Sequence, residues 1–442
     1  MSNYQGKFIL WVAMMGMALT ALAQPKYNSP YSRLGLGDLI DQNFITQSGL
    51  GGLSTAASDP HHINIYNPAS LSALETTAFE VGVNARYSNL QNSDGTEATL
   101  WGGNLSYLAL GFPMRNSINE VLDPRDHKLK WGMAFALVPF TTVGYDIETT
   151  EFVPGADTIR YQFEGTGGTY RFVWGNSIRI NNFSAGLNLS YLFGKISREH
   201  QVLPDLVNSY QEVFIDEFSV GGLVWDLGVQ YDLELDRDRS DDKPSTRKLT
   251  LGATIRANNS FSTNASRLYR TFNPQYADVD TFEMVTDVAG NGTLPASFSI
   301  SAMYVKTNKY RFGIQYDYTQ WENYRNDAKE EVLANTWRLA VGGEFIPDYS
   351  SYNKYSKKIR YRAGAFYSTD PRTVFNNSLT NYGINIGLGF PIILPRQRTS
   401  YMNMALELGR FGNEASLLET YARLSVGFTL NDNSWFFKRK FN

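Results

Sequence analysis

Residues 79–89 read Phe-Glu-Val-Gly-Val-Asn-Ala-Arg-Tyr-Ser-Asn, with apolar residues at the odd positions as far as Tyr87. Because successive side chains of a strand point to opposite faces, this alternation predicts a strand with one apolar and one polar face. Thirteen further segments of this kind follow along the chain. Strands of about ten residues that recur in this way are typical of a barrel spanning a lipid bilayer. Closure of the barrel pairs every backbone polar group, as hydrocarbon requires.

The connections between the fourteen predicted strands are alternately short and long. The two-residue turns Asn181-Asn182 and Thr307-Asn308 follow even-numbered strands, whereas the long stretches 197–221 and 261–294 follow odd-numbered ones. Short turns face the periplasm and long loops face the outside, so this order supports an even number of strands. The predicted strands are residues 79–89, 100–112, 130–140, 169–180, 183–196, 222–235, 248–260, 295–306, 309–319, 335–346, 358–369, 381–391, 400–409 and 420–430.

The first 23 residues have the pattern of a cleavable export signal. Lys7 precedes the mostly apolar run 8–23, which ends in the typical cleavage sequence Ala21-Leu22-Ala23. The chain has no cysteine, which excludes disulfides, thiolate metal sites and N-terminal acylation. No basic stripe indicates a nucleic-acid partner. These features predict a protein in the outer membrane of a Gram-negative bacterium, surrounded by outer-membrane lipid.

Residues 24–77 precede the first strand and do not alternate. They are rich in glycine, serine, alanine, asparagine and aspartate, and they are too long for a simple tail. We expect this segment to fold back into the lumen as a hatch, because its apolar content disfavours a disordered arm. The apolar pairs Phe44-Ile45 and Ile65-Tyr66 are the expected hatch anchors.

Several motifs resemble those of FadL-like outer-membrane transporters. Gly49-Leu-Gly-Gly-Leu-Ser is similar to part of that family's hatch, and Asn67-Pro68-Ala69 matches its Asn-Pro-Ala motif before the first strand. Further similar segments are Met133-Ala-Phe-Ala-Leu-Val-Pro-Phe, Leu294-Pro-Ala-Ser-Phe, Trp321-Glu-Asn-Tyr and Tyr361-Arg-Ala-Gly. The resemblance implies a fourteen-stranded barrel with a lumenal hatch. It also implies passive uptake of hydrophobic small molecules such as long-chain fatty acids, through a lumenal pocket and lateral release. Other members of the family carry nothing and are barrel subunits of secretion or assembly complexes.

The chain departs from the transporter pattern after its last predicted strand. An aromatic-basic tail, residues 431–442, follows there. Aromatic rings and basic side chains at a membrane interface commonly act as anchors. The tail therefore either anchors the barrel or binds a partner in an outer-membrane or periplasmic protein complex. Its candidate anchor residues are Trp435, Phe436, Phe437, Lys438, Arg439 and Lys440.

Catalytic and metal-binding patterns are not found in the sequence. The four histidines, at positions 61, 62, 127 and 200, lie outside the interiors of the predicted strands. A hydrolase site on the barrel wall would need a nucleophile or activated water beside a histidine or carboxylate, and the positions of the histidines disfavour a Ser-His site there. We therefore predict no enzyme, no cofactor and no metal site.

Polar residues on the inward face of the strands are candidate lumen residues. An inward arginine can bind a ligand carboxylate, but it more often pairs with an acidic residue of the wall or hatch. The candidates are Glu80, Asn84, Arg86, Arg171 and Arg179.

The sequence therefore predicts an all-β transmembrane antiparallel barrel with an N-terminal lumenal hatch. Its expected parts are a signal peptide (1–23), a hatch (24–77), a barrel (78–430) and a tail (431–442). Uptake of a hydrophobic ligand is the leading function implied by the resemblance, and a non-transporting subunit is the alternative. Transport predicts a continuous apolar pocket between loops 197–221 and 261–294. A subunit role predicts a filled lumen and contacts through residues 236–247 or the tail.

Overall fold

The computed structural model describes residues 29–92, 95–114, 129–154, 157–206, 208–236, 246–273, 275, 278–374, 377–394 and 398–432. The predicted signal peptide and the tail anchor residues Trp435 to Lys440 lie outside these ranges. Within the described residues, no helix is both long and apolar enough to cross a bilayer.

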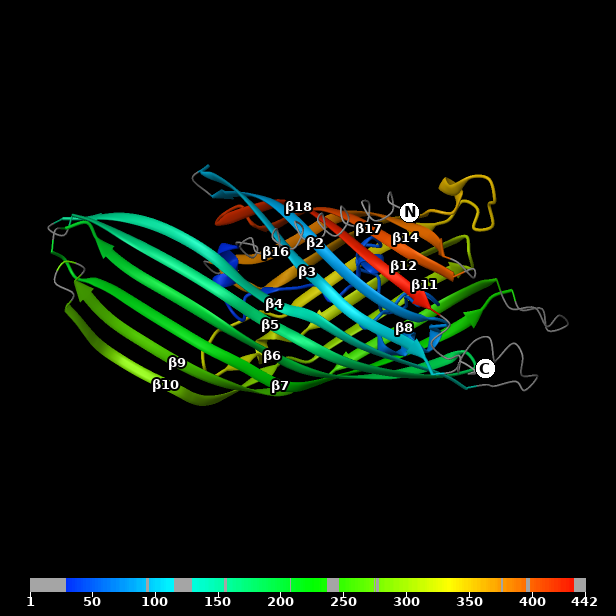
Figure 1. The fold of residues 1–442 in the computed structure, drawn as a ribbon, viewed down its shortest axis with the longest axis horizontal. Helices are drawn as coiled ribbons and strands as arrows, with labels where there is room; N and C mark the ends of the chain where they lie inside the picture. The colour runs from blue at the N-terminus through cyan, green and yellow to red at the C-terminus, as the bar shows by residue number, and fades with distance from the viewer. Residues whose placement is uncertain are drawn as a thin grey trace, which may run out of the picture.

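Successive strands of the wall pair antiparallel, and β18 pairs with β2 to close the ring (Figure 1). Among the described residues, fourteen wall strands form this barrel, with four extra strands. The extra strands arise because β8–β9 and β10–β11 are each one interrupted wall strand, and because β1 and β13 are short additions. The wall strands are β2 (Thr77–Asn92), β3 (Glu97–Pro113), β4 (Leu129–Val153), β5 (Asp157–Ile180), β6 (Phe183–Pro204), β7 (Gln211–Glu234), β8 (Arg247–Arg256), β9 (Asn259–Asn273), β10 (Asp278–Leu294), β11 (Ser297–Lys306), β12 (Tyr310–Thr319), β14 (Thr336–Phe345), β15 (Arg360–Val374), β16 (Asn377–Leu394), β17 (Arg398–Asn413) and β18 (Leu417–Asp432). Each predicted strand falls on one of them, so the fold class is confirmed.

The barrel has an apolar outer face and a polar inner face. On β6, Leu189 and Tyr191 are exposed, whereas Asn188 and Ser190, which alternate with them, are buried. A soluble protein would bury the first pair and expose the second, so the outer face is suited to lipid. The outward apolar series on β6 ends at Phe193, which marks the upper border of the membrane band.

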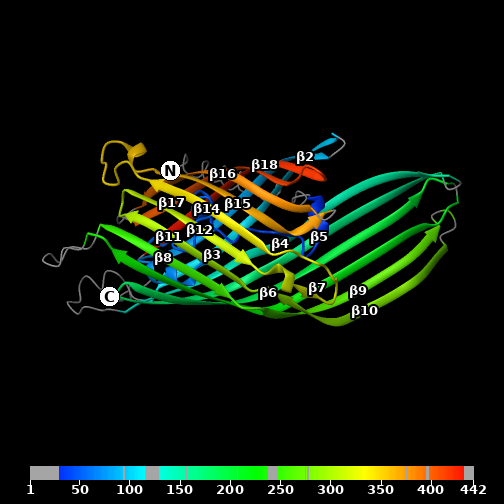
Figure 2. The ribbon, with the colours of Figure 1, turned by 180° about the vertical axis from the view of Figure 1, so that it is seen from behind.

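Six strands continue well beyond this border. Figures 1 and 2 show β4, β5, β6, β7, β9 and β10 projecting past the ends of the other strands. The short turn Asn181-Asn182 lies at the opposite end, so the projection is extracellular. The prediction of loops over 197–221 and 261–294 is therefore wrong, because both stretches are mostly strand. Above the membrane both faces meet water, and the alternation that reveals a lipid-facing strand disappears.

Residues 29–76, here called the lumenal segment, fold inside the barrel. They contain η1 (Pro30–Arg33), β1 (Asp38–Leu39), α2 (Ile45–Ser48) and η2 (Pro68–Ala73). Leu53, Ile63 and Leu71 are completely buried against the wall. The remaining short elements, η3 (Trp321–Asn323), β13 (Arg325–Asn326) and η4 (Tyr355–Lys357), lie in connections between wall strands. The lumenal segment is thus packed against the inner face of the wall.

Candidate functional site

The barrel wall is incomplete between β3 and β4. These strands pair only where Leu108–Pro113 of β3 meets Gly132–Leu137 of β4. Higher up, the pairing of β4 with β5, its other neighbour, has a register irregularity between Pro139 and Thr141. Proline cannot donate a backbone hydrogen bond to a neighbouring strand, which weakens pairing at this point.

The lumenal segment occupies the edge of β4 that faces this gap. Asp38 and Leu39 of β1 pair with Thr142 and Thr141. The backbone N–H of Ile40 donates to the carbonyl of Phe140 at 3.0 Å. The edge of β4 is therefore bonded to the lumenal segment instead of to β3.

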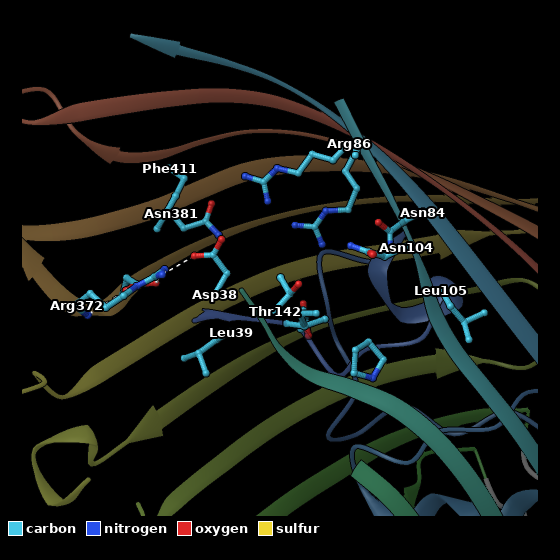
Figure 3. Close-up of a pocket in the computed structure, with 16 residues that line it drawn as sticks. Asp38, Leu39, Asn84, Arg86, Asn104, Leu105, Thr142, Arg372, Asn381 and Phe411 are labelled. Carbon is cyan, nitrogen blue, oxygen red and sulfur yellow. Dashed lines mark hydrogen bonds and ion pairs between the residues drawn. The ribbon is translucent and has the colours of Figure 1, made fainter. Parts of the chain in front are cut away.

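A cavity of about 120 Å³ lies behind the gap (Figure 3). Figure 3 shows Asn84 and Arg86 of β2 on one side of it and Arg372 of β15 on the other. A second cavity of about 290 Å³ adjoins the first, because both are lined by Leu39. The second cavity also has aromatic lining residues, namely Phe140, Trp321, Trp337 and Phe366.

The arginines that line these cavities are paired with carboxylates. Arg372 contacts Asp38 and also Asp370, the latter at 2.7 Å. The Arg86–Glu419 and Arg423–Glu407 distances are 2.7 and 3.1 Å. Binding pockets for apolar ligands are lined mainly by apolar side chains with few polar groups. The ionic lining of the first cavity differs from that pattern.

A second ionic cluster fastens the lumenal segment to the wall. Asp59 lies 2.6 Å from Arg360, 3.8 Å from Arg311 and 3.1 Å from His62. Burial disfavours the charged form of Asp59, yet the adjacent Arg360 guanidinium holds the pKa of that carboxyl well below its usual value. Burial also lowers the pKa of His62 to about 4, so this imidazole is neutral at pH 7.

Glu344 completes the cluster on the wall side. Its carboxylate lies 2.6 Å from Arg362 and 3.1 Å from Arg311. All of these side chains are less than a tenth exposed. Truncating one partner of a buried ion pair typically costs about 3–5 kcal/mol. The cluster therefore holds the lumenal segment firmly.

Wall side chains also bind the backbone of the lumenal segment directly. Gln315 accepts from the N–H groups of Ser54 and Thr55 at 2.8 and 2.9 Å. Asn188 donates to the carbonyl of Ile65 at 2.7 Å. Glu80 accepts from the N–H of Ile63 at 2.7 Å. Contacts from several sides of the ring thus satisfy the irregular backbone inside the lumen.

The other candidate lumen residues are bonded to the wall. Asn84 donates to Ser106 at 2.7 Å. Arg171 pairs with Asp226 at 2.6 Å, and Arg179 pairs with Asp232 at 2.7 Å. Each of these three side chains thus has a wall partner, and Asn84 also lines the first cavity.

The candidate hatch residues are at the centre of the lumenal packing. Phe44 stacks on Tyr107 of β3 with ring centroids 3.8 Å apart, and Ile45 and Ile65 are buried. The Tyr66 hydroxyl donates to Asp317 at 3.0 Å.

The Asn-Pro-Ala motif begins η2. Asn67 caps this 3-10 helix by accepting from the N–H of Ala69 at 3.0 Å, and its amide donates to the carbonyl of Thr55 at 2.6 Å. Pro68 stands at the first position of the helix, where its missing N–H costs nothing. Pro68 and Ala69 are buried against the wall. The motif therefore has a structural part in joining the two halves of the lumenal segment.

Sequence reasoning did not find the residues of the ionic cluster. Arg360 and Arg362 are buried on either side of the exposed Tyr361. Two charged residues that alternate with a lipid-facing aromatic residue were therefore the sequence pattern that could have revealed this cluster. The expectation for the histidines also needs correction, because His200 lies inside β6 and stacks on Phe163 at 4.3 Å. The described residues contain no group of three or more potential metal ligands.

The cavity at the extracellular end has a mixed lining. It measures about 500 Å³ and lies between Phe163, Phe214 and Tyr269, in the region of the predicted long loops. Arg33, Arg198 and Arg267 also line it. The lining is thus partly aromatic and partly ionic.

Comparison with known proteins gives a family and a fold. A family model described as BamG matches residues 6–442. No curated protein sequence matches the chain. Among solved structures, a Pseudomonas aeruginosa FadL homologue is 13% identical with a TM-score of 0.55, covering 89% of this chain and 98% of that one. The CymD monoaromatic hydrocarbon channel is 13% identical with a TM-score of 0.52, covering 90% and 99%. The Ralstonia pickettii toluene transporter TbuX is 11% identical with a TM-score of 0.53, covering 88% and 99%. The fold is therefore that of FadL-like outer-membrane channels. None of these three matched structures is described as an enzyme.

Proposed function

Because the chain belongs to the BamG family and has the barrel of FadL-like channels, we propose that it is a non-transporting barrel subunit of an outer-membrane assembly complex. In this role the barrel is a membrane-embedded scaffold, and its lumen is closed.

The filled lumen is the observation that carries the proposal. The lumenal segment is held by the buried cluster around Asp59 and Glu344 and by backbone hydrogen bonds from Gln315, Asn188 and Glu80. Opening such a lumen would break several buried polar contacts together, at about 1–3 kcal/mol for each buried group left unpaired. A scaffold benefits from this rigidity, whereas a passive channel must open to its ligand.

Passive uptake of a hydrophobic small molecule, such as a long-chain fatty acid, is the second candidate function. The gap between β3 and β4 favours it, because the cavities behind the gap offer a lateral route into the bilayer. In this reading, movement of β1 away from β4 would open the route.

The lesser parts of the chain fit either candidate. We propose that residues 1–23 are an export signal and that residues 24–77 form the hatch that closes the lumen. We propose that residues 431–442 are an interfacial anchor or a contact to the rest of the complex.

A tagged copy expressed at its native level and extracted in mild detergent tests the two candidates. Stoichiometric protein partners without an enriched lipid are the result expected for a subunit. A lone barrel carrying an enriched fatty acid or hydrocarbon would overturn the subunit proposal and support uptake.

A Leu39→Trp variant sharpens the comparison, because Leu39 lines both cavities behind the gap. The larger ring should fill this space and reduce uptake of a labelled fatty acid if the gap is a transport route. It should leave the protein complex unchanged if the barrel is a scaffold.

A further inference from the structure

Among the described residues, the edge of β10 that faces away from β9 has an unpaired stretch of backbone. On its inner side β10 pairs with β9 along almost its whole length. On its outer side, the described residues pair only with its lower end, where β13 meets Gly292 and Thr293. Asn291 exchanges hydrogen bonds with Asp327, through its N–H at 2.8 Å and its carbonyl at 2.9 Å. Figures 1 and 2 show β10 at the border of the projecting sheet.

This free edge lies outside the membrane. Asn291 is the register partner of Ser262 on β9, and Ser262 is the register partner of Gly221 on β7. Gly221 in turn pairs with Phe193, the last lipid-facing residue on β6. The twelve residues 279–290 continue from this register into the projection that Figures 1 and 2 show. At about 3.3 Å per residue they present an edge of roughly 40 Å to water.

The backbone groups that face the free edge follow from the register. Residues of an antiparallel strand bond alternately to one neighbour and to the other. The backbone of Asn291 bonds to the side away from β9. The register with β9, followed through its two irregularities, then shows which of the residues before Asn291 face the same side. The outward-facing backbone groups are therefore those of Ala289, Met284, Thr281 and Val279.

The side chains of this edge suit a partner better than solvent. Phe282 is 63% exposed and Met284 is 71% exposed, although both lie above the lipid-facing band. Exposed edge strands are normally protected from pairing by proline, charged side chains (lysine above all), bulges or coverage by another element. Residues 279–290 contain neither proline nor lysine, but they include three acidic residues and two register irregularities, so a matching strand must be basic and must follow both irregularities.

The charges of the edge indicate which partner fits. Residues 279–290 contain Asp280, Glu283 and Asp287 and no basic residue. The opposite border of the projection, residues 146–153 of β4, is likewise acidic and has no basic residue. Like charges on facing strands are destabilising, so the two borders do not favour closing on each other. The same repulsion disfavours a second copy of this chain pairing edge to edge.

We propose that the outer edge of β10, from Val279 to Ala289, binds an added antiparallel strand from another protein of the complex at the cell surface. The added strand carries lysine or arginine residues opposite the carboxylates of β10 and apolar residues against Phe282 and Met284. Main-chain hydrogen bonds supply affinity in this mode of binding, and the side chains supply specificity. The added strand would continue the line that β13 begins. This inference rests on the subunit role proposed above.

Photo-crosslinking in intact cells tests the geometry. Val279, Thr281 and Met284 are replaced, one at a time, by a photoreactive amino acid in the tagged native-level protein. We expect crosslinks to one extended, basic segment of one partner, stepping along it in reverse order. Crosslinks to a second copy of the chain, scattered crosslinks or no crosslinks would overturn the proposal.

Matched proline variants test the energetics. Met284→Pro removes an outward N–H that only an added strand would use, and proline is tolerated on edge strands. Thr150→Pro removes the equivalent N–H on the β4 border. Phe140 and Gly144 accept hydrogen bonds from the lumenal segment on the side away from β5, and Thr150 faces that side too because residues of a strand alternate. We expect Met284→Pro to lower partner recovery about tenfold, the loss of roughly one hydrogen bond plus local contacts. Thr150→Pro should leave recovery unchanged.

The outcomes distinguish this inference from the function on which it rests. Equal partner recovery with Met284→Pro and Thr150→Pro would refute the strand addition while leaving the subunit role intact. A wild-type barrel with no stoichiometric partner would refute both. Resistance of the folded barrel to unfolding by detergent at room temperature shows that each variant is correctly folded before recovery is compared.

Discussion

Replacing Asp59 by asparagine should release the lumenal segment from the barrel wall. The Asp59 carboxylate lies 2.6 Å from Arg360 and 3.8 Å from Arg311, and its side chain is only 9% exposed. In Asp59→Asn the neutral amide leaves the arginines of this cluster with Glu344 as their remaining close carboxylate among the described residues. Removing one partner of a buried ion pair costs about 3–5 kcal/mol, so we expect a loss of that size.

Amide hydrogen exchange of the detergent-solubilised barrel measures this loss locally. The N–H groups of Ser54, Thr55 and Ile63 are bonded to wall side chains, so their exchange reports release of the segment. A cost of about 3–5 kcal/mol corresponds to exchange faster by roughly 10² to 10⁴-fold, if the segment opens as a unit.

Asp205→Asn is the matched control. Asp205 pairs with Arg160 at 3.3 Å, but the two side chains are 47% and 43% exposed. Exposed pairs contribute about 0–1 kcal/mol, so exchange of the lumenal amides should not change. If Asp59→Asn accelerated exchange no more than Asp205→Asn does, the buried cluster would not be what holds the segment. The double variant Asp59→Asn with Arg360→Gln should lose less than the two single variants together, because it removes both charges.

Further perturbations test other contacts of the lumenal segment. The His62 pKa is lowered from 6.5 to about 4 by burial, so the unfolded chain binds a proton that the folded chain does not as pH falls below 6.5. Stability to urea, followed by tryptophan fluorescence, should therefore fall between pH 6.5 and 4, and a flat profile in His62→Gln would assign this slope. Gly51 has φ +74°, and an added Cβ would lie 2.9 Å from the backbone nitrogen of Ala365. Gly51→Ala should thus destabilise the barrel by about 1–2 kcal/mol or more in the same urea assay, and unchanged stability would show that the backbone shifts freely. Arg372→Gln removes the charge that holds Asp38 of β1, so it should widen the gap and raise single-channel conductance in planar bilayers. Conductance equal to that of the wild type would mean that the pairing of β1 with β4 closes the gap without the Arg372–Asp38 ion pair.

The membrane-spanning part of the fold could be read from the chain because a bilayer imposes a strict pattern. On β5, for example, Phe172 and Trp174 are exposed to lipid, while Arg171 and Val173, which alternate with them, are buried in the lumen. The contrast between lipid and a polar lumen is large, so each spanning strand alternates clearly. The contrast ends at the membrane border, and the extracellular halves of β6 and β7 lost their signal with it. His200 was accordingly not recognised as part of a strand.

The sequence by itself determined the barrel, its strand number and the inward placement of residues such as Arg86, Arg171 and Arg179. Only the tertiary structure decided their partners, because the partner of an inward charge depends on register and on which strand comes alongside. Arg171 reaches Asp226 two strands away, and Asp59 meets Arg360 from about 300 residues along the chain. The gap beside β4 and the free edge of β10 are likewise tertiary features. Each follows from where a neighbouring strand stops pairing, and local residue patterns do not record that point.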